Sequence, residues 1–176
     1  GAVFRVRPDG TGFAVLHAFA PGEGVVPGHG ALARGPDGVF YGTTRRGGAD
    51  DRGTVYRLEV GPGGASVTTL HAFVAPDGDP DSGVILASDG LLYGTFGDGL
   101  TSASTVYRLA TDGTAFERLH ILTNGVRPTG TLLEGSDGLL YGTAEDGGVH
   151  GGGTVFRLSR DGAAFTTLVD LEGHPV

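Results

Sequence analysis

The sequence contains no cysteine, which excludes disulfide bonds and thiol catalysis and leaves the redox compartment of the protein open. It also contains no methionine, even at position 1, so we expect the chain to be cut from a longer protein or to follow tag removal. No apolar run approaches the ~18 residues that a membrane-spanning helix needs. The net charge of −8, without any basic run, argues against nucleic acid and anionic membrane surfaces as partners.

Glycine is what the sequence has in quantity, with 35 residues in 176, and 9 prolines accompany it. Such a content approaches that of low-complexity segments. The glycines, however, recur at regular distances between short apolar segments, and no helical periodicity is present. This pattern is typical of tight turns, many of which need a positive φ, and it therefore favours ordered β structure over disorder.

A short phrase recurs three times along the chain: an Asp-Gly pair, two apolar residues and Tyr-Gly-Thr. Asp-Gly between apolar segments is the strongest short signal for a β-hairpin, so each copy predicts two strands joined by a tight turn. A Gly-rich loop, a third strand that carries one arginine, a second turn and a fourth strand follow. In the last copy the four expected strands cover residues 130–136, 139–143, 153–158 and 168–171.

Four short strands in every ~50 residues predict an all-β protein, a β-propeller-type repeat of four-stranded antiparallel blades. We expect about 14 strands, about 3.5 blades and no helix longer than a turn or so. The single repeat domain of residues 1–176 divides into a half-blade (1–26) and three blades (27–79, 80–127 and 128–176). A leucine-rich or hexapeptide solenoid would repeat at half this length or less, and an immunoglobulin-like sandwich would not repeat.

The text from Leu132 to Thr143, followed by Gly152 to Leu158, resembles the tandem GloVer repeats of bacterial choice-of-anchor surface proteins. The resemblance covers essentially the whole chain. It implies a propeller-like β protein displayed on the surface of a bacterium or outside the cell. It implies no reaction.

The two ends of the chain leave the predicted ring open. The chain begins on a third strand and ends where a new first strand would start, so the first half-blade lacks its first two strands. Three and a half blades do not close a ring of the usual four to eight blades. We therefore expect either a homo-oligomer, a dimer or a larger ring, or an excised fragment.

One arginine recurs within each third strand, flanked by apolar residues. These residues are Arg5, Arg57, Arg108 and Arg157. They either form a ring of cations for an anionic ligand or hold neighbouring blades together. Because the planar guanidinium suits fixed pairing, we predict structural arginines that are mostly buried and paired, with Arg108→Ala costing about 3–5 kcal/mol of stability. The expected partners are the hairpin residues Asp37, Asp89 and Asp137.

A histidine recurs in the fourth strand of the first three copies, as His17, His71 and His120, and Val169 takes its place in the last copy. The alternatives are metal ligands, a proton relay or structural residues. Propeller symmetry places equivalent residues on successive blades, too far apart to share a metal whose bonds are about 2.1 Å long. We therefore predict a structural role.

The repeated Tyr41, Tyr93 and Tyr141 could stack on a sugar, but the same rings pack equally well between blades, which is the reading we favour. Aspartates at alternate positions, as in calcium loops, indicate a candidate Ca²⁺ site, although the glutamate expected at the twelfth position is absent. These residues are Asp77, Asp79 and Asp81. We expect no other cofactor.

Two functions from different classes remain. The first is a non-catalytic extracellular module that binds or displays, with a glycan or protein partner, and that assembles through its open half-blade. The second is a propeller enzyme, a lyase or glycosidase, with its site at the central tunnel. The second requires non-repeating polar residues that converge on one place. The candidates are few and scattered: His29, Glu134, Glu145 and His150.

Overall fold

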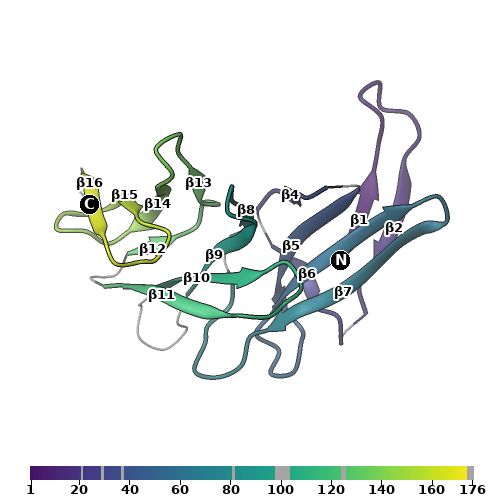
Figure 1. Cartoon of the computed structure of the whole chain (residues 1–176), viewed down its shortest axis with the longest axis horizontal. Coiled ribbons are helices and arrows are strands. Elements are labelled where there is room, and N and C mark those ends of the chain that lie inside the picture. Colours follow the sequence, from purple (N-terminus) through teal and green to yellow (C-terminus); the bar gives the residue numbers. More distant parts are fainter. Residues whose placement is uncertain are drawn as a thin grey trace.

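The computed structural model describes residues 1–20, 22–28, 30–36, 38–80, 82–97, 104–123 and 126–173. These residues form 16 β-strands in four antiparallel sheets, and they contain no helix (Figure 1). The all-β prediction is confirmed. The strand number exceeds the expected ~14 because the first strand of two sheets is broken into two short pieces.

Each sheet contains strands that follow one another in the sequence. The half-blade contains β1 (Ala2–Arg5) and β2 (Ala14–Ala18). Blade 1 contains β3 (Val25–Pro27), β4 (Ala33–Arg34), β5 (Val39–Arg46), β6 (Thr54–Gly61) and β7 (Gly64–Ala72). Blade 2 contains β8 (Ile85–Leu86), β9 (Leu91–Gly97), β10 (Ser104–Ala110) and β11 (Glu117–Leu122). Blade 3 contains β12 (Arg127–Pro128), β13 (Leu133–Glu134), β14 (Leu140–Asp146), β15 (Gly151–Leu158) and β16 (Phe165–Glu172).

Two of the Asp-Gly pairs, Asp89-Gly90 and Asp137-Gly138, form the tight turns that the sequence predicts, and Asp37 lies outside the described residues. Gly90 has a φ of 82°, in the left-handed region that glycine adopts without steric cost. The carboxylate of Asp89 accepts a hydrogen bond from the backbone N–H of Leu91 at 3.1 Å, a side-chain contact that stabilises the turn. Asp137 and Gly138 repeat both features in blade 3.

The second and third strands pair in the same register in all three blades. The tyrosine of Tyr-Gly-Thr lies opposite the repeated arginine, and the glycine lies opposite an aromatic residue. The glycine pairs are Gly42 with Tyr56, Gly94 with Tyr107, and Gly142 with Phe156. A Cβ atom on Gly42 or Gly94 would lie 2.5 Å from the hydroxyl oxygen of the opposite tyrosine, so the ring occupies the space that a side chain would need.

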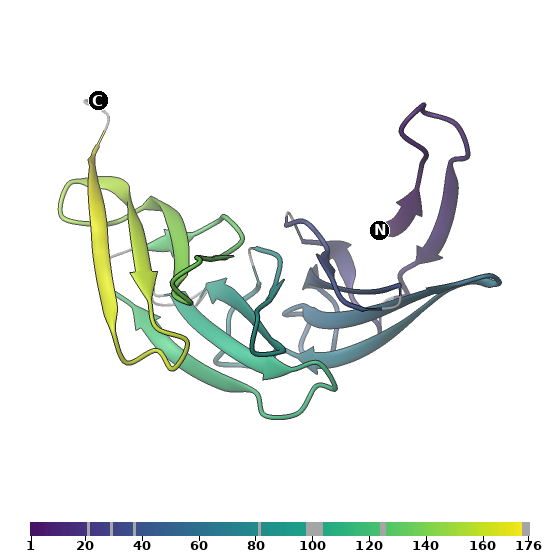
Figure 2. The same cartoon turned by 45° about the horizontal axis from the view of Figure 1, so that its top comes forward.

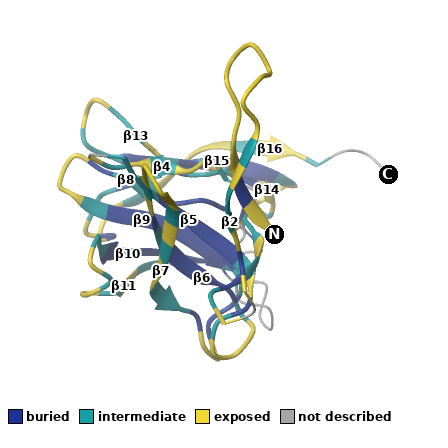
Figure 3. Cartoon of the chain, turned by 90° about the vertical axis from the view of Figure 1, so that its right-hand side faces the viewer, coloured by how far each residue is buried: buried dark blue, intermediate teal, exposed yellow. Residues whose placement is uncertain are grey.

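The blades follow one another along an open arc with the two termini at opposite ends (Figure 2). Three apolar clusters lie where successive sheets face each other. Buried residues run along the middle strands of the blades, whereas the turns that connect the strands are exposed (Figure 3). The core of this protein is therefore a series of similar interfaces, each built from two neighbouring sheets.

Candidate functional site

The repeated histidines lie at the interfaces between blades. His71 on β7 stacks on Phe116 of blade 2, with ring centroids 3.8 Å apart and planes 6° from parallel. His120 on β11 stacks in the same way on Phe165 of blade 3, at 4.6 Å and 10°. His17 instead contacts Phe19 edge-on and forms a 2.7 Å hydrogen bond with Glu23. The sequence could not show Phe116 and Phe165 as stacking partners, because each belongs to another blade than its histidine.

Burial favours the neutral form of the His71 side chain. Desolvation lowers the pKa of this imidazole below its usual 6.5, Asp77 opposes the shift, and Arg118 adds to it. Within the described part of the chain, its buried Nε2 atom has no hydrogen-bond partner. The neutral ring is therefore the form that the interface between blades 1 and 2 favours.

The repeated arginines are less buried than the sequence led us to expect. Arg5 is exposed, and Arg57, Arg108 and Arg157 are half-buried. The prediction of burial is wrong because a long arginine side chain packs its aliphatic part against the sheet and extends its guanidinium to solvent. A partly exposed pair contributes about 1 kcal/mol or less, so the cost expected for Arg108→Ala falls to that level.

Of the hairpin aspartates expected to be partners of these arginines, Asp137 has its pKa lowered mainly by a hydrogen bond from Tyr141 and to a lesser extent by the nearby charge of Arg157, whereas Asp89 does not pair with Arg108. Arg108 pairs with Glu117, directly opposite on β11, at 2.7 Å. Arg57 pairs with Glu59 on its own strand at 2.5 Å. The hairpin aspartates accept hydrogen bonds from tyrosines instead, and Asp37 lies outside the described residues.

Two of the tyrosines of Tyr-Gly-Thr are anchored to their hairpins by hydrogen bonds. The hydroxyl of Tyr93 donates to Asp89 at 2.8 Å, and that of Tyr141 donates to Asp137 at 2.7 Å. Burial, with a smaller contribution from Asp89, raises the pKa of Tyr93 to about 12. Tyr41 and Tyr93 are buried, with exposed fractions of 4% and 0%. Two of the three rings are therefore covered by neighbouring blades and present no free face to a sugar.

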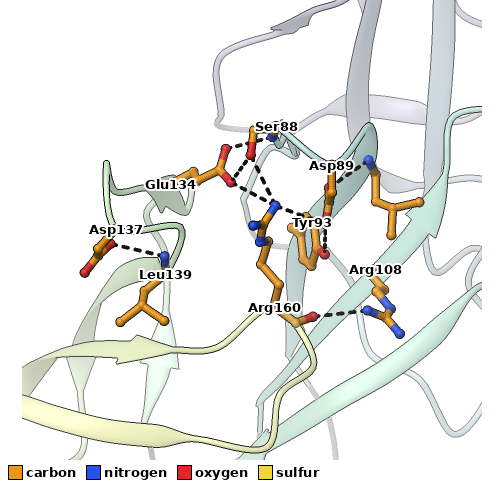
Figure 4. Close-up of polar contacts among 9 residues, drawn as sticks. Ser88, Asp89, Tyr93, Arg108, Glu134, Asp137, Leu139 and Arg160 are labelled. Atoms are coloured by element: carbon orange, nitrogen blue, oxygen red, sulfur yellow. Dashed lines mark hydrogen bonds and ion pairs between the residues drawn. The ribbon is translucent and has the colours of Figure 1, made fainter.

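A polar cluster links blades 2 and 3 (Figure 4). Arg160, in the turn between β15 and β16, lies 3.5 Å from Asp89 and 3.3 Å from Glu134, and it donates to the hydroxyl of Ser88 at 3.2 Å. Glu134 accepts two 2.8 Å hydrogen bonds from Ser88, and Arg108 donates to the carbonyl of Arg160 at 3.3 Å. Sequence reasoning did not identify Arg160, because this arginine is not part of the repeated pattern.

The proposed calcium loop is occupied by arginine contacts. Asp77 is 4% exposed and accepts a 2.9 Å hydrogen bond from Nε of Arg118, which belongs to blade 2. Asp79 lies 3.7 Å from Arg46, and Asp81 lies outside the described residues. In the part of the chain that the structure describes, no three acidic, histidine or cysteine residues form a group that could hold a metal ion.

Glu134 and Glu145, two of the candidates for an enzymatic site, lie at different ends of blade 3. Glu134 belongs to the interblade cluster. Glu134 pairs with Leu140 at the start of β14. Glu145 lies five residues further along, near the end of the same strand, and forms a 2.9 Å ion pair with Arg127. His150 is exposed, and His29 lies outside the described residues.

The two ends of the arc expose apolar faces. We name the outer face of the half-blade the N-terminal face; its residues are 49% to 64% exposed and comprise Phe4, Val6, Phe13 and Val15. We name the outer face of β16 the C-terminal face; its residues are 43% to 47% exposed and comprise Leu168, Val169 and Leu171.

These two faces correspond to the two sides of the interface between blades. Phe13 precedes His17 by four residues, just as Phe116 precedes His120. Phe13 therefore occupies the position of a ring that stacks on a histidine of the preceding blade. Val169 occupies the histidine position, on the side that faces a following blade. Among the residues that the structure describes, no further blade covers either position.

Comparison with known proteins agrees with this architecture. The sequence model of the Gloeobacter/Verrucomicrobia repeat matches residues 1–175. No curated protein matches the sequence. The fold is similar to that of a chain in the crystal structure of a nidogen/laminin complex, with a TM-score of 0.62 and 19% identity, covering 90% of this chain and 52% of that one. The chain therefore spans about half the length of that protein. The likeness shows the fold, and the prediction of a β-propeller-type fold is confirmed.

A GH43 β-1,3-galactosidase is a more distant structural match. Its TM-score is 0.49 at 13% identity, and the alignment covers 96% of this chain and 38% of the galactosidase chain. A likeness this distant carries no argument about activity.

Among the described residues there is also no helix that could span a membrane.

Proposed function

Because this chain belongs to the Gloeobacter/Verrucomicrobia repeat family, as its resemblance to GloVer repeats led us to expect, we propose that it is a non-catalytic β-propeller module of a bacterial cell surface. In this proposal it displays its exposed loops to a glycan or protein partner outside the cell. It assembles with further copies of itself through the N-terminal and C-terminal faces. The net charge of −8 disfavours nucleic acid as the partner.

The observation that carries the assembly proposal is the complementarity of the two faces. Inside the chain, Phe116 and Phe165 each cover a histidine of the preceding blade. At the two ends of the described chain, Phe13 and Val169 occupy the same two positions, no described blade covers them, and they are 64% and 47% exposed. Two copies placed head to tail would bring these residues together and remove both apolar faces from water. Such a contact is heterologous, so it leads to closed rings or to filaments.

The enzyme alternative has less support. A lyase or glycosidase of this fold needs polar residues that converge at the central tunnel. Glu134 and Glu145 instead form ion pairs with arginines at opposite ends of blade 3.

Sedimentation of designed variants tests the head-to-tail contact. Wild type should show a mass that rises with concentration, whereas Phe13→Glu and Val169→Glu should each remain monomeric because a charge replaces an apolar contact. Val149→Glu is the matched control, because Val149 is 84% exposed but lies outside both faces. This variant should behave as wild type does.

Mixing the two monomeric variants sharpens the test. Val169→Glu keeps an intact N-terminal face, and Phe13→Glu keeps an intact C-terminal face. The mixture should therefore form a dimer with one intact interface and grow no further. A wild-type protein that remains monomeric at micromolar concentrations, or a mixture that does not associate, would contradict the proposed assembly.

A further inference from the structure

A cavity of about 150 Å³ lies between blades 2 and 3. One wall comes from β11 in blade 2 and the other from β15 and β16 in blade 3, and the residues that line it include His120, Leu122, Thr154, Phe165, Thr167 and Asp170. Thr167 is exposed, so the cavity is reached from solvent beside β16. Both walls belong to full blades, and the cavity is therefore a feature of the repeated interface.

The interface between blades 1 and 2 shows why this space is empty. Arg118 in blade 2 and Thr167 in blade 3 hold the same position, two residues after the phenylalanine that stacks on a histidine. The Nε atom of Arg118 donates to Asp77 at 2.9 Å, and the charge of this arginine, together with the larger effect of desolvation, lowers the pKa of His71. The guanidinium thus lies near the stacked rings. Threonine is too short to reach the same space, which leaves a cavity.

The cavity contains a carboxylate without a counter-charge. Asp170 accepts hydrogen bonds from the backbone N–H groups of Val149 at 2.9 Å and His150 at 3.3 Å, and no basic side chain of the described residues forms an ion pair with it. The other copies of the repeat have alanine or isoleucine at this position, so the acid is particular to this interface. A half-buried carboxylate of this kind favours a cation beside it.

The cavity also contains a buried hydroxyl group without a partner. Thr154 is 2% exposed, and its hydroxyl oxygen has no hydrogen-bond partner among the residues that the structure describes. In blade 1 the hydroxyl oxygen of the equivalent Thr54 lies 2.9 Å from that of Thr44, but Ala144 replaces this second threonine in blade 3. An unpaired buried hydroxyl is costly, so a ligand that donates a hydrogen bond to it gains affinity.

Size and chemistry together favour a guanidinium group as the occupant. A cavity of about 150 Å³ can hold a benzene ring, which has six non-hydrogen atoms, and an arginine side chain beyond Cβ has the same number. The guanidinium has five N–H donors and no acceptor, and its planar face stacks on aromatic rings. A neutral sugar would leave the carboxylate of Asp170 without a counter-charge.

We propose that the cavity between blades 2 and 3 binds the guanidinium group of an arginine side chain from a partner protein. The group takes the place that Arg118 holds in the preceding interface. It pairs with Asp170, donates to the hydroxyl of Thr154 and lies beside the rings of His120 and Phe165. This inference names the chemistry of one partner of the proposed binding module, and it rests on that proposal.

An NMR titration of the ¹⁵N-labelled protein tests the site, with N-acetyl-arginine amide as the ligand. The matched control is N-acetyl-citrulline amide, which has nearly the same shape but is neutral. At about 0.15 M salt, which screens charges elsewhere on the surface, the arginine derivative should bind saturably at millimolar concentration. It should shift most strongly the amide signals of Thr154 and of the two donors to Asp170, Val149 and His150. The citrulline derivative should bind at least about fivefold more weakly.

A capped Gly-Gly-Arg-Gly-Gly peptide distinguishes a protein partner from a free guanidino compound. The cavity has room for the side chain alone, so the peptide backbone stays outside. The peptide should therefore bind at least as tightly as the arginine derivative does. A peptide that fails to bind where the small derivative binds would overturn the assignment to a protein partner.

Two variants test the contacts. Asp170→Asn keeps an oxygen for the backbone hydrogen bonds but removes the charge, so the arginine and citrulline derivatives should bind it with affinities within about twofold of each other. Thr167→Arg places an arginine of the chain itself in the cavity, as in blade 2, and should abolish binding. Leu133→Arg is the matched control for the added charge, because Leu133 is 66% exposed and does not line the cavity. Thermal melting checks that each variant is folded.

The proposal is overturned if the arginine derivative does not bind at millimolar concentration, if the citrulline derivative binds equally well, or if the shifts centre elsewhere. Binding to folded Thr167→Arg as strong as to wild type would also overturn it. Sedimentation decides the head-to-tail contact separately. A monomeric wild type would contradict the proposed assembly and leave these titrations unaffected.

Discussion

The glycine of Tyr-Gly-Thr should not tolerate even a methyl group. In Gly94→Ala the new Cβ atom would lie 2.5 Å from the hydroxyl oxygen and 2.7 Å from Cζ of Tyr107. Ordinary carbon contacts are about 3.5–4.0 Å, so the ring or the strand must move by about 1 Å. Tyr107 is fully buried, and its ring centroid lies 5.5 Å from those of Phe73 and Phe116, which leaves it little room.

The net effect follows from two opposing contributions. Overpacking costs about 1–3 kcal/mol, and the reduced entropy of the unfolded chain returns about 0.5–1 kcal/mol. We expect Gly94→Ala to lower the free energy of unfolding by about 1–2 kcal/mol, which corresponds to about 2–8 °C in melting temperature. Urea titration and thermal melting followed by circular dichroism measure both quantities.

Gly61→Ala is the matched control. Gly61 also lies in a strand, but no atom lies within 4 Å of its Cβ position, so we expect unchanged or slightly higher stability. In a Tyr107→Leu background the cost of Gly94→Ala should fall by at least about 1 kcal/mol, because the overlapping ring is absent. Equal effects of Gly94→Ala and Gly61→Ala would refute the steric reasoning.

Three further predictions concern the interfaces between blades. In urea titration, Arg118→Ala should lower the free energy of unfolding by about 1–3 kcal/mol, because it leaves the buried carboxylate of Asp77 without its partner. Arg127→Ala, whose ion pairs are about half exposed, should lower it by less than about 1 kcal/mol. Similar losses for the two variants would contradict this prediction. The pKa of His71 in the folded state lies below 6.5, so at low pH the unfolded state binds more protons than the folded state does. Unfolding measurements from about pH 8 to pH 5 should therefore show wild type losing stability relative to His71→Phe. A difference in stability between the two proteins that does not change with pH would contradict the prediction that His71 titrates in this range. Arg160→Ala should cost about 1 kcal/mol at low salt and less at about 0.5 M salt, since its ion pairs are partly exposed; a cost independent of salt would argue for packing instead.

Much of the fold could be predicted because the signals are local and repeated. The Asp-Gly turns, the alternation of short apolar segments and the distance between copies lie within a few residues of each other. Each copy therefore specifies its own hairpins, and three copies agree on one architecture. The break of two first strands into short pieces, such as β12 and β13, carries no comparable signal and was missed.

The partners of the repeated polar residues could not be predicted in the same way. The sequence suggested that Asp89 is a partner of the repeated third-strand arginines, but its carboxylate accepts a hydrogen bond from Tyr93 and lies near Arg160, which is outside the repeated pattern and 71 positions further along the chain. Which acidic side chain pairs with which arginine depends on how far these side chains extend between two packed sheets.

The sequence by itself determined the strands, the turns and the family, because these follow from residues that are neighbours in the chain or in one hairpin. Only the tertiary structure decided that the histidines stack on aromatic rings of the next blade, that Asp77 pairs with Arg118, and that Phe4 and Phe13 remain uncovered. These contacts join residues on different sheets. Their geometry depends on how one twisted sheet packs on the next, and no local pattern encodes that arrangement.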